Sequence, residues 1–349
     1  MKASHYIGWD IGGAHLKVAS VSAIGEIGVI EQFATPLWHG LELLEDTFPS
    51  AIEKLPDGTL SHVLTMTAEL VDIFKDRESG MKTLVNLCET ILGGNIRLYA
   101  TDGKILNLVN ANKKINHLAS ANWHASATYV ASLVGSGLFV DVGSTTTDII
   151  PFSNKTVATR GRDDQGRLRF DELVYTGVIR TPLMSLTKRI PFAGEWQNLA
   201  VESFANTADV YRVLGAIEEA DDLMDTADGG KKDITSSIRR LVRMLGTDSN
   251  SFKLSDKSWR NLAQYFEEMQ VQMLTKSILR VLTSVDVKKQ KIVGAGVGCF
   301  LVKKIARRLN IPYIEFSELC ASDSKLSRQC NTCAPAVALA QLNRLSTIR

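Results

Sequence analysis

The apolar positions near the start of the chain predict a β-hairpin with a glycine turn. Residues 6–21 read YIGWDIGGAHLKVASV: an apolar run ends at Asp10, two glycines follow, and an alternation of apolar and polar residues resumes. A period of two is typical of a strand, whereas dinucleotide and P-loop fingerprints place a helix after their glycines. We therefore expect two antiparallel strands here, and the pattern argues against both of those nucleotide-binding motifs.

A second stretch repeats this arrangement. Residues 137–152 read GLFVDVGSTTTDIIPF: Asp141 ends an apolar strand, Gly143 makes the turn, hydroxyl residues occupy 144–147, and Asp148 precedes another apolar run. Two copies of one strand, turn and strand pattern indicate an internal repeat. We expect the two hairpins to occupy corresponding places in two similar halves of the molecule.

The remaining stretches predict a mixture of strands and helices. A short strand is expected at 96–100 and a helix of small residues within 118–134, while residues from about 195 to 288 show mostly helical periodicity. Residues 291–316 predict a strand, an amphipathic helix and another strand. Between that first strand and the helix lie three glycines, Gly294, Gly296 and Gly298.

Composition places the chain among ordinary globular proteins. Its 349 residues, 45% of them hydrophobic and 22% charged, suffice for two lobes with a core each. The formal net charge of +2 gives no reason to expect a nucleic acid or an anionic membrane as partner. We find no secretory leader pattern and no apolar run of membrane-spanning length, and we expect a cytoplasmic protein.

The five cysteines favour reduced thiols over a disulfide framework, because their number is odd and they are widely spread. Cys330 and Cys333 form the one close pair. A zinc site would need two further ligands that no spacing in the sequence supplies. We therefore favour thiols packed at the start of a helix over a metal or redox role for this pair.

The two glycine turns point to a site for a polyphosphate and a magnesium ion. Glycine lets phosphate oxygens approach the backbone, and N–H groups in such turns can point at an anion. A carboxylate beside the turn would repel phosphate, but Asp10 and Asp141 become favourable if Mg²⁺ bridges carboxylate and phosphate oxygens. A single aspartate of this kind is more often a turn cap. Two copies and a third glycine turn favour the metal-binding interpretation.

Three motifs together resemble a known superfamily. The stretches WDIGGAHLK at 9–17, VDVGSTTTD at 140–148 and VGAGVGCFL at 293–301 are similar to the two phosphate loops and the adenosine loop of the actin, sugar kinase and Hsp70 superfamily. Within it, the chain resembles the hydantoinase A and oxoprolinase group, and there the proteins linked to tetrahydromethanopterin-dependent one-carbon transfer. The stretches that carry this closer likeness are 65–80, 121–127, 171–183 and 225–248.

The resemblance implies an α/β fold of two actin-like, ribonuclease H-like lobes with a ligand cleft between them. We expect the first lobe to comprise residues 1–132 plus 334–349. The second is expected at 133–333, with a helical elaboration at about 195–288. The oligomeric state is left open.

The same resemblance implies a function. One branch of the group is similar to the aryl ether synthases of methanofuran-type cofactors, which join an aminomethylfuran-methyl diphosphate to the phenol of a γ-glutamyl-tyramine and release pyrophosphate. For this chain the acceptor is left open between a tyramine-type and a tyrosine-type phenol. We expect such a Mg²⁺-dependent transferase, with these small molecules as its substrates; ATP is a further candidate cofactor. The alternatives are an ATP-dependent kinase or ATP-hydrolysing ligase of the same fold and, less favoured, a ligand-sensing regulator.

The expected site residues follow from the three loops and from the resemblance. Asp10 and Asp141 are the candidate metal ligands and, with Glu69 and Asp148, the candidate catalytic residues. The residues expected to bind the diphosphate or a nucleotide are Gly12, Gly13, His15, Lys17, Gly143, Ser144, Thr145, Thr146, Arg180, Gly294, Gly296 and Gly298.

A phenol with a solution pKa of about 10 needs a base to accept its proton. Glu69 and Asp148 are candidates, but Glu69 equally suits the N-terminal end of a helix. Asp102 is a weaker candidate, since an aspartate in ATDGK is typical of a turn. The arginine stripe 239–243 either contacts substrate or forms a solvated helix face, while Arg180 lies in an otherwise apolar stretch where a charge needs a reason.

Overall fold

The computed structural model of the protein describes residues 4–112, 117–248, 255–284, 291–320 and 323–348. Its first large sheet has the strand order β3-β2-β1-β4-β5-β6, with β1, β4 and β5 parallel to one another and the other pairs antiparallel. These strands are β1 (His5–Ile11), β2 (His15–Ser22), β3 (Ile27–Ala34), β4 (Leu60–Met66), β5 (Arg97–Tyr99) and β6 (Ile105–Asn107).

Strand β1 is buried on both faces, and the alternation of its side chains decides what each face meets. Ile7, Trp9 and Ile11 pack into a core with side chains of α1 (Glu42–Glu53) and α2 (Arg77–Leu92). The intervening positions, among them Gly8 and Asp10, lie on the opposite face of the strand. There Gly8 meets the backbone of α12 (Ala334–Ile348). The predicted hairpin is confirmed, since β1 and β2 pair antiparallel from His5–Ser22 to Ile11–Leu16.

The second large sheet has the order β10-β8-β7-β13-β14, with β9 paired to β8. It confirms the predicted repeat: β7 and β8 form a hairpin in which Asp141 and Asp148 face each other across the strands, and β13 and β14 run parallel to β7. Its strands are β7 (Gly137–Val142), β8 (Thr147–Ser153), β9 (Thr156–Val157), β10 (Leu173–Val174), β13 (Ile292–Ala295) and β14 (Tyr313–Glu315).

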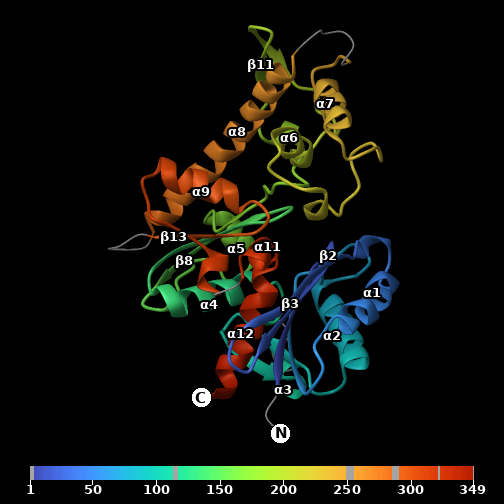
Figure 1. Cartoon of the computed structure of the whole chain (residues 1–349), viewed down its shortest axis with the longest axis vertical. Helices are drawn as coiled ribbons and strands as arrows, with labels where there is room; N and C mark the ends of the chain where they lie inside the picture. The colour runs from blue at the N-terminus through green and yellow to red at the C-terminus, as the bar shows by residue number, and fades with distance from the viewer. Residues whose placement is uncertain (1–3, 113–116, 249–254, 285–290, 321–322, 349) are drawn as a thin grey trace.

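Two helices, α4 (Asn122–Val134) and α12, lie between the sheets and join them (Figure 1). One apolar cluster contains Ala19 and Ile30 of the first sheet, Phe139 and Ile150 of the second, and small residues of α12. The expected division into lobes at 132/133, a position inside α4, stays a prediction. The C-terminal helix packs against β1, β2 and α4.

The third glycine stretch folds as predicted, with β13, helix α9 (Cys299–Arg308) and β14 in that order. The cysteine pair precedes α12: Cys330 lies in α11 (Ser327–Thr332), and both Cys330 and Cys333 are buried free thiols. The remaining short elements are α3 (Leu108–Asn112), α5 (Asp164–Arg169), α10 (Phe316–Leu319) and the 3-10 helices η1 (Leu37–His39), η3 (Leu183–Ser185), η4 (Glu219–Asp221) and η6 (Ser324–Leu326).

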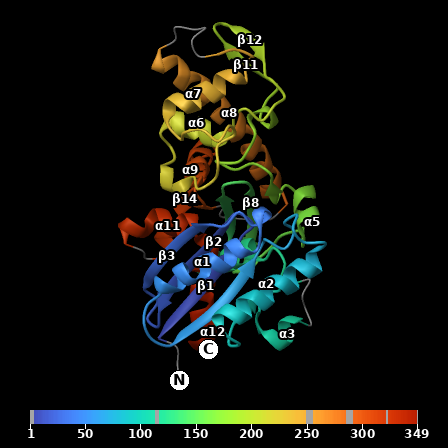
Figure 2. The same cartoon turned by 90° about the vertical axis from the view of Figure 1, so that its right-hand side faces the viewer.

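A mainly helical part rises above the second sheet (Figure 2). It contains α6 (Thr207–Leu214), α7 (Ile234–Arg243) and α8 (Asp256–Leu282), each begun by a capping side chain from Asn206, Asp233 or Ser255. The sequence pattern missed a strand here. β12 (Glu195–Asn198) pairs with β11 (Arg189–Phe192), although all four β12 side chains are exposed and show no apolar alternation.

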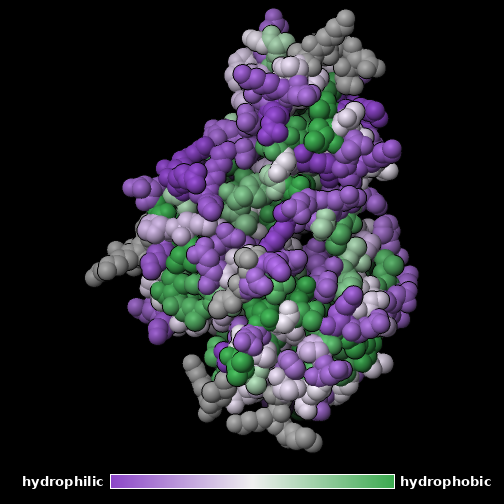
Figure 3. Space-filling model, in the orientation of Figure 1, coloured by the Kyte–Doolittle hydropathy of each residue, from purple (hydrophilic) through white to green (hydrophobic). Residues whose placement is uncertain are grey.

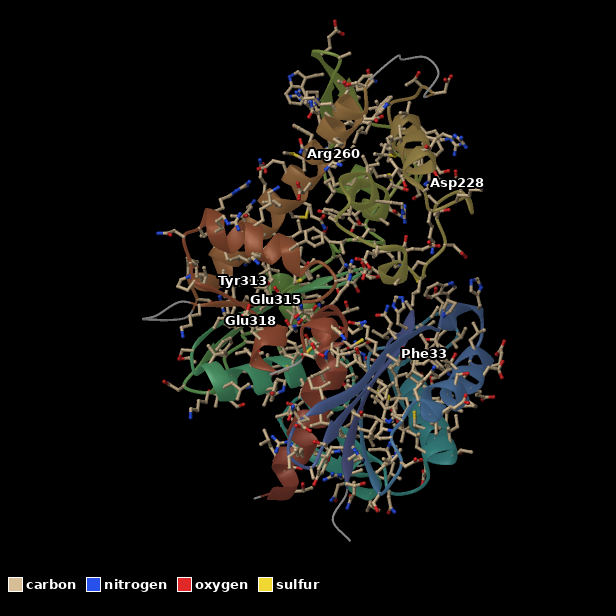
Figure 4. The ribbon with its side chains drawn as sticks, in the orientation of Figure 1. Phe33, Asp228, Arg260, Tyr313, Glu315 and Glu318 are labelled. Carbon is tan, nitrogen blue, oxygen red and sulfur yellow. The ribbon has the colours of Figure 1, made fainter. Side chains whose placement is uncertain are left out.

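Of the arginine stripe of α7, Arg239 is exposed as on a solvated face, whereas Arg240 and Arg243 pair with carboxylates. Arg240 is fully buried, and its guanidinium lies 2.8 Å from Asp209 and 2.9 Å from Asp228. Arg243 is 3.0 Å from Asp228, which lies beside α7 in Figure 4. These charges hold the helical part together, because a buried guanidinium needs carboxylate partners.

Figure 3 shows hydrophilic and hydrophobic residues mixed over one face of the molecule. In the described ranges no helix is both long enough and apolar enough to span a membrane.

Candidate active site

Both hairpin loops open onto one cavity of about 350 Å³. Its wall contains every hairpin residue that the sequence singled out, together with Arg180, and these are Asp10, Gly12, Gly13, His15, Lys17, Asp141, Gly143, Ser144, Thr145, Thr146, Asp148 and Arg180. The two copies of the repeat therefore face each other across a shared cavity. Glu69 and the three glycines of the third loop are not among the lining residues.

Asp10 is a buried carboxylate with one oxygen that lacks a hydrogen-bond partner in the described ranges. Its side chain is 4% exposed, and within the described ranges its Oδ1 atom has no hydrogen-bond partner. Burial raises the pKa of Asp10 to about 6, against the opposing effects of the Lys17 ammonium and a hydrogen bond from Asn122. An unpartnered buried oxygen that lines a cavity is suited to a ligand that the carboxylate can bind.

Asp141 and Asp148 bring two more carboxylates to the same cavity. Burial raises the pKa of Asp141 to about 7, and the negative charges of Asp148 and Asp10 add to the shift. Burial also raises the pKa of Asp148, but the Arg167 guanidinium beside it opposes that shift. Arg167 is itself buried, stacks over the Trp123 ring at 4.1 Å and donates to the Glu172 carbonyl. Asp148 is thus the carboxylate of this group that already has a cationic partner.

Lys17, Arg180 and His15 line the same cavity as the carboxylates. Lys17 is the cross-strand partner of Asp10, and its ammonium donates to the carbonyl of Thr332, the last residue of α11, at 2.9 Å. Arg180 packs over Trp38 at 5.0 Å, with its NH1 atom 3.5 Å from the Thr145 hydroxyl. Burial, Lys17 and Arg180 together lower the pKa of His15 to about 3, so His15 is neutral near pH 7. The cavity therefore contains two cations, Lys17 and Arg180, together with its carboxylates.

The loop backbones repeat one geometry that refines the expectation from sequence. The Gly12 N–H donates to the His15 carbonyl and the Gly143 N–H to the Thr146 carbonyl, both at 2.9 Å. These two N–H groups close the turns and do not face an anion, contrary to our expectation for glycine turns. The N–H groups of the following loop residues and the hydroxyls of 144–146 are the donors that can bind an anion.

The third glycine loop packs against Asp141 and does not line the cavity. A Cβ atom at Gly296, where φ is +82°, would lie 2.4 Å from the Asp141 carboxylate. One at Gly294 would lie 2.6 Å from the ring of Tyr313, the first residue of β14, which is labelled in Figure 4. Gly298 likewise meets Val142. Each glycine permits close packing in the second sheet, and none of the three lines the cavity.

Glu69 does not line the cavity but contacts Ser120, which does. It is fully buried, accepts a hydrogen bond from the Ser120 hydroxyl at 2.8 Å and lies 3.8 Å from Arg77. Burial raises its pKa, against the effects of Ser120 and Arg77. Asp102 lies in an exposed turn and accepts from the Lys104 N–H, which supports the turn interpretation.

Several lining residues were missed from sequence. Asn122 and Trp123 lie in a stretch that carried the family resemblance, and Ser120 has a left-handed backbone with φ +48° that sequence does not reveal. Asp164 and Arg167 come from the six-residue helix α5. Their charges meet Asp148 and Arg77 only in the folded chain, so no spacing signal could identify them.

The residues present fit a magnesium ion that arrives with phosphate. Mg²⁺ is commonly bound by one or two carboxylates together with water and substrate phosphates. Asp10 and Asp141 supply two such carboxylates. In the described ranges no group of three or more His, Cys, Asp or Glu side chains could hold a metal ion alone. The donor set thus suits a metal completed by the ligand rather than a resident metal centre.

The two raised pKa values predict how the stability of the metal-free protein depends on pH. Each carboxyl stabilises the folded protein fully below its ordinary pKa of 3.8. As pH rises above 3.8, the carboxyl ionises in the unfolded chain while it keeps its proton in the folded protein, so this stability is lost by about pH 6 for Asp10 and about pH 7 for Asp141. Thermal melts in EDTA should therefore show a smaller decline over this range for Asp10→Asn than for wild type. Parallel curves would contradict the burial of this charge.

Comparisons with known proteins agree with this architecture. The two-lobed α/β fold is shared with a solved structure. Acetone carboxylase, solved without nucleotide in a study of ATP-dependent acetone carboxylation, matches 86% of this chain and 66% of its own with a TM-score of 0.51 at 9% identity. Residues 61–342 match the hydantoinase/oxoprolinase family. The chain therefore belongs to the hydantoinase/oxoprolinase family.

Two curated archaeal relatives share one enzyme name, (4-{4-[2-(γ-L-glutamylamino)ethyl]phenoxymethyl}furan-2-yl)methanamine synthase. The protein from Methanocaldococcus jannaschii is 36% identical over 248 residues, which cover 71% of this chain and 73% of the relative. The protein from Methanococcus vannielii is 34% identical over 159 residues, which cover 46% of this chain and 70% of the relative.

Proposed function

We propose that this protein forms an aryl ether. The phenolic oxygen of a γ-glutamyl-tyramine-type acceptor bonds to the methylene carbon of an aminomethylfuran-methyl diphosphate. The bond from that carbon to the diphosphate oxygen breaks, pyrophosphate leaves with the electron pair, and the phenol loses its proton. The observation that carries the proposal is the cavity between the two hairpins, which combines paired carboxylates with fixed cations. The enzyme name of the two archaeal relatives supports the same reaction.

The hairpins suit the diphosphate end of the donor. Lys17 and Arg180 neutralise the negative charge that grows on the leaving group as the carbon–oxygen bond breaks. The hydroxyls of Ser144, Thr145 and Thr146 and the free loop N–H groups bind its oxygens. Asp10 and Asp141 would hold Mg²⁺, which when bound supplies further charge neutralisation at the diphosphate.

The proton of the phenol needs an acceptor, and we assign this role to Glu69, reached through Ser120. The Ser120 hydroxyl lines the cavity and already donates to Glu69. It can therefore take the phenolic proton while it passes its own to the carboxylate. Burial raises the pKa of Glu69, which favours acceptance of a proton. Asp148 is the weaker candidate because Arg167 stabilises its ionised form.

The reaction products decide between this function and that of a kinase. Incubation of the protein with the furan diphosphate, γ-glutamyl-tyramine and Mg²⁺ should give the aryl ether and pyrophosphate without ATP, as measured by mass spectrometry. ATP consumption that yields a phosphorylated product and no ether would overturn the proposal in favour of the kinase.

A further inference from the structure

A second cavity of about 460 Å³ adjoins the site, and its volume is in the range of small-molecule pockets. Trp38 and Arg180 belong to the walls of both cavities. These two side chains therefore mark the junction, and the residues that line only the second cavity lie beyond it. No motif in the sequence indicated this second cavity.

The second cavity combines an apolar wall with exposed polar residues. Pro36, Pro182 and Met224 line it together with the half-buried Trp38. His39 and Asp225, both exposed, line this cavity and not the first, and the His39 ring centroid lies 5.8 Å from that of Trp38. An aromatic ring of a ligand would meet Trp38 and the apolar wall, while polar groups of the same ligand would meet the His39 imidazole and the Asp225 carboxylate.

We propose that this second cavity binds the phenolic acceptor, an inference that rests on the proposed ether-forming function. The acceptor has a phenol at one end and the amino and carboxylate groups of a γ-glutamyl residue at the other. With its ring against Trp38, its phenolic oxygen reaches the first cavity past Arg180. The glutamyl ammonium is then bound by Asp225 and the glutamyl carboxylate by His39.

Filling the cavity tests this assignment. Ala227 lines the second cavity, whereas Ala220 lies in the same segment, is exposed and lines neither cavity. Ala227→Trp should raise the KM for γ-glutamyl-tyramine about tenfold or more and leave the KM for the furan diphosphate within about twofold. Ala220→Trp, the matched control, should change neither constant. Calorimetric titration of γ-glutamyl-tyramine into protein holding Mg²⁺ and pyrophosphate should show the same pattern.

The far end of the acceptor is tested separately. Wild type should use γ-glutamyl-tyramine about tenfold or more better than tyramine, as kcat/KM, and Asp225→Asn should reduce that preference. If wild type forms no ether, the proposed function fails. If it does form the ether but Ala227→Trp behaves like Ala220→Trp, the acceptor site is overturned and the function stands.

Discussion

Replacing Asp141 or Asp10 by asparagine should reduce ether formation about a hundredfold or more while the fold is retained. Asparagine keeps the size of the side chain but removes the charge that would hold Mg²⁺ at the diphosphate. The loss should appear both in kcat and in a weaker Mg²⁺ dependence of pyrophosphate binding, measured by calorimetry. The same change at Asp102, which lines neither cavity, should leave the rate unchanged.

The thermal stability of the asparagine variants distinguishes a loss of metal binding from a loss of folded structure. Burial without full compensation raises the pKa of both carboxyls, so above pH 7 each asparagine variant should melt no lower than the metal-free wild type. A variant that loses activity and also loses stability would indicate a structural role. Variants that bind Mg²⁺ and pyrophosphate as wild type does would leave only the role of turn caps for Asp10 and Asp141.

Gly8→Ala should destabilise the whole molecule. A Cβ atom at Gly8 would lie 2.0 Å from the Ala336 carbonyl oxygen and 2.6 Å from the Ala340 nitrogen, both backbone atoms of α12. A helix backbone cannot rotate away as a flexible side chain can, so α12 must move off the sheet. Overpacking typically costs 1–3 kcal/mol, and we expect about 3 kcal/mol or more here, measured by urea unfolding.

Gly94→Ala is the matched control for this change. Gly94 is exposed and an added Cβ would meet nothing within 4 Å, so its substitution should change the free energy of unfolding by less than about 0.5 kcal/mol. Since Lys17 is held by the carbonyl of Thr332 just before α12, Gly8→Ala should also weaken pyrophosphate binding. Equal stability of the two variants would contradict the packing of α12 on β1.

The hairpins were predictable because their signals are local. Strand alternation on both sides of Gly12 and Gly143 determines the pairing, and the repeat of an aspartate at each turn suggested a shared ligand. Even so, sequence could not show that the Gly12 and Gly143 N–H groups close the turns. That depends on the carbonyls of His15 and Thr146, whose orientation follows from backbone angles and not from residue type.

Contacts between distant residues account for the rest of what the sequence missed. Arg167 reaches Asp148 only because α5 packs beside β10, the partner strand of β8, and Ser120 brings the buried Glu69 into contact with the cavity wall. The β12 strand was missed because its exposed side chains show no alternation of apolar and polar residues. In each case the signal lies in tertiary packing, which overrides local pattern.

The position of α12 between the sheets matters during synthesis of the chain. Lys17 and its partner Thr332 are 315 residues apart, so the Gly8 face of the first sheet must wait for the last helix before it can be covered. At 5–20 residues per second, a ribosome needs roughly 15 to 60 seconds to complete that interval. During this time the face of β1 that α12 will cover stays exposed on the nascent chain, so the first sheet completes its packing only after synthesis of the last helix.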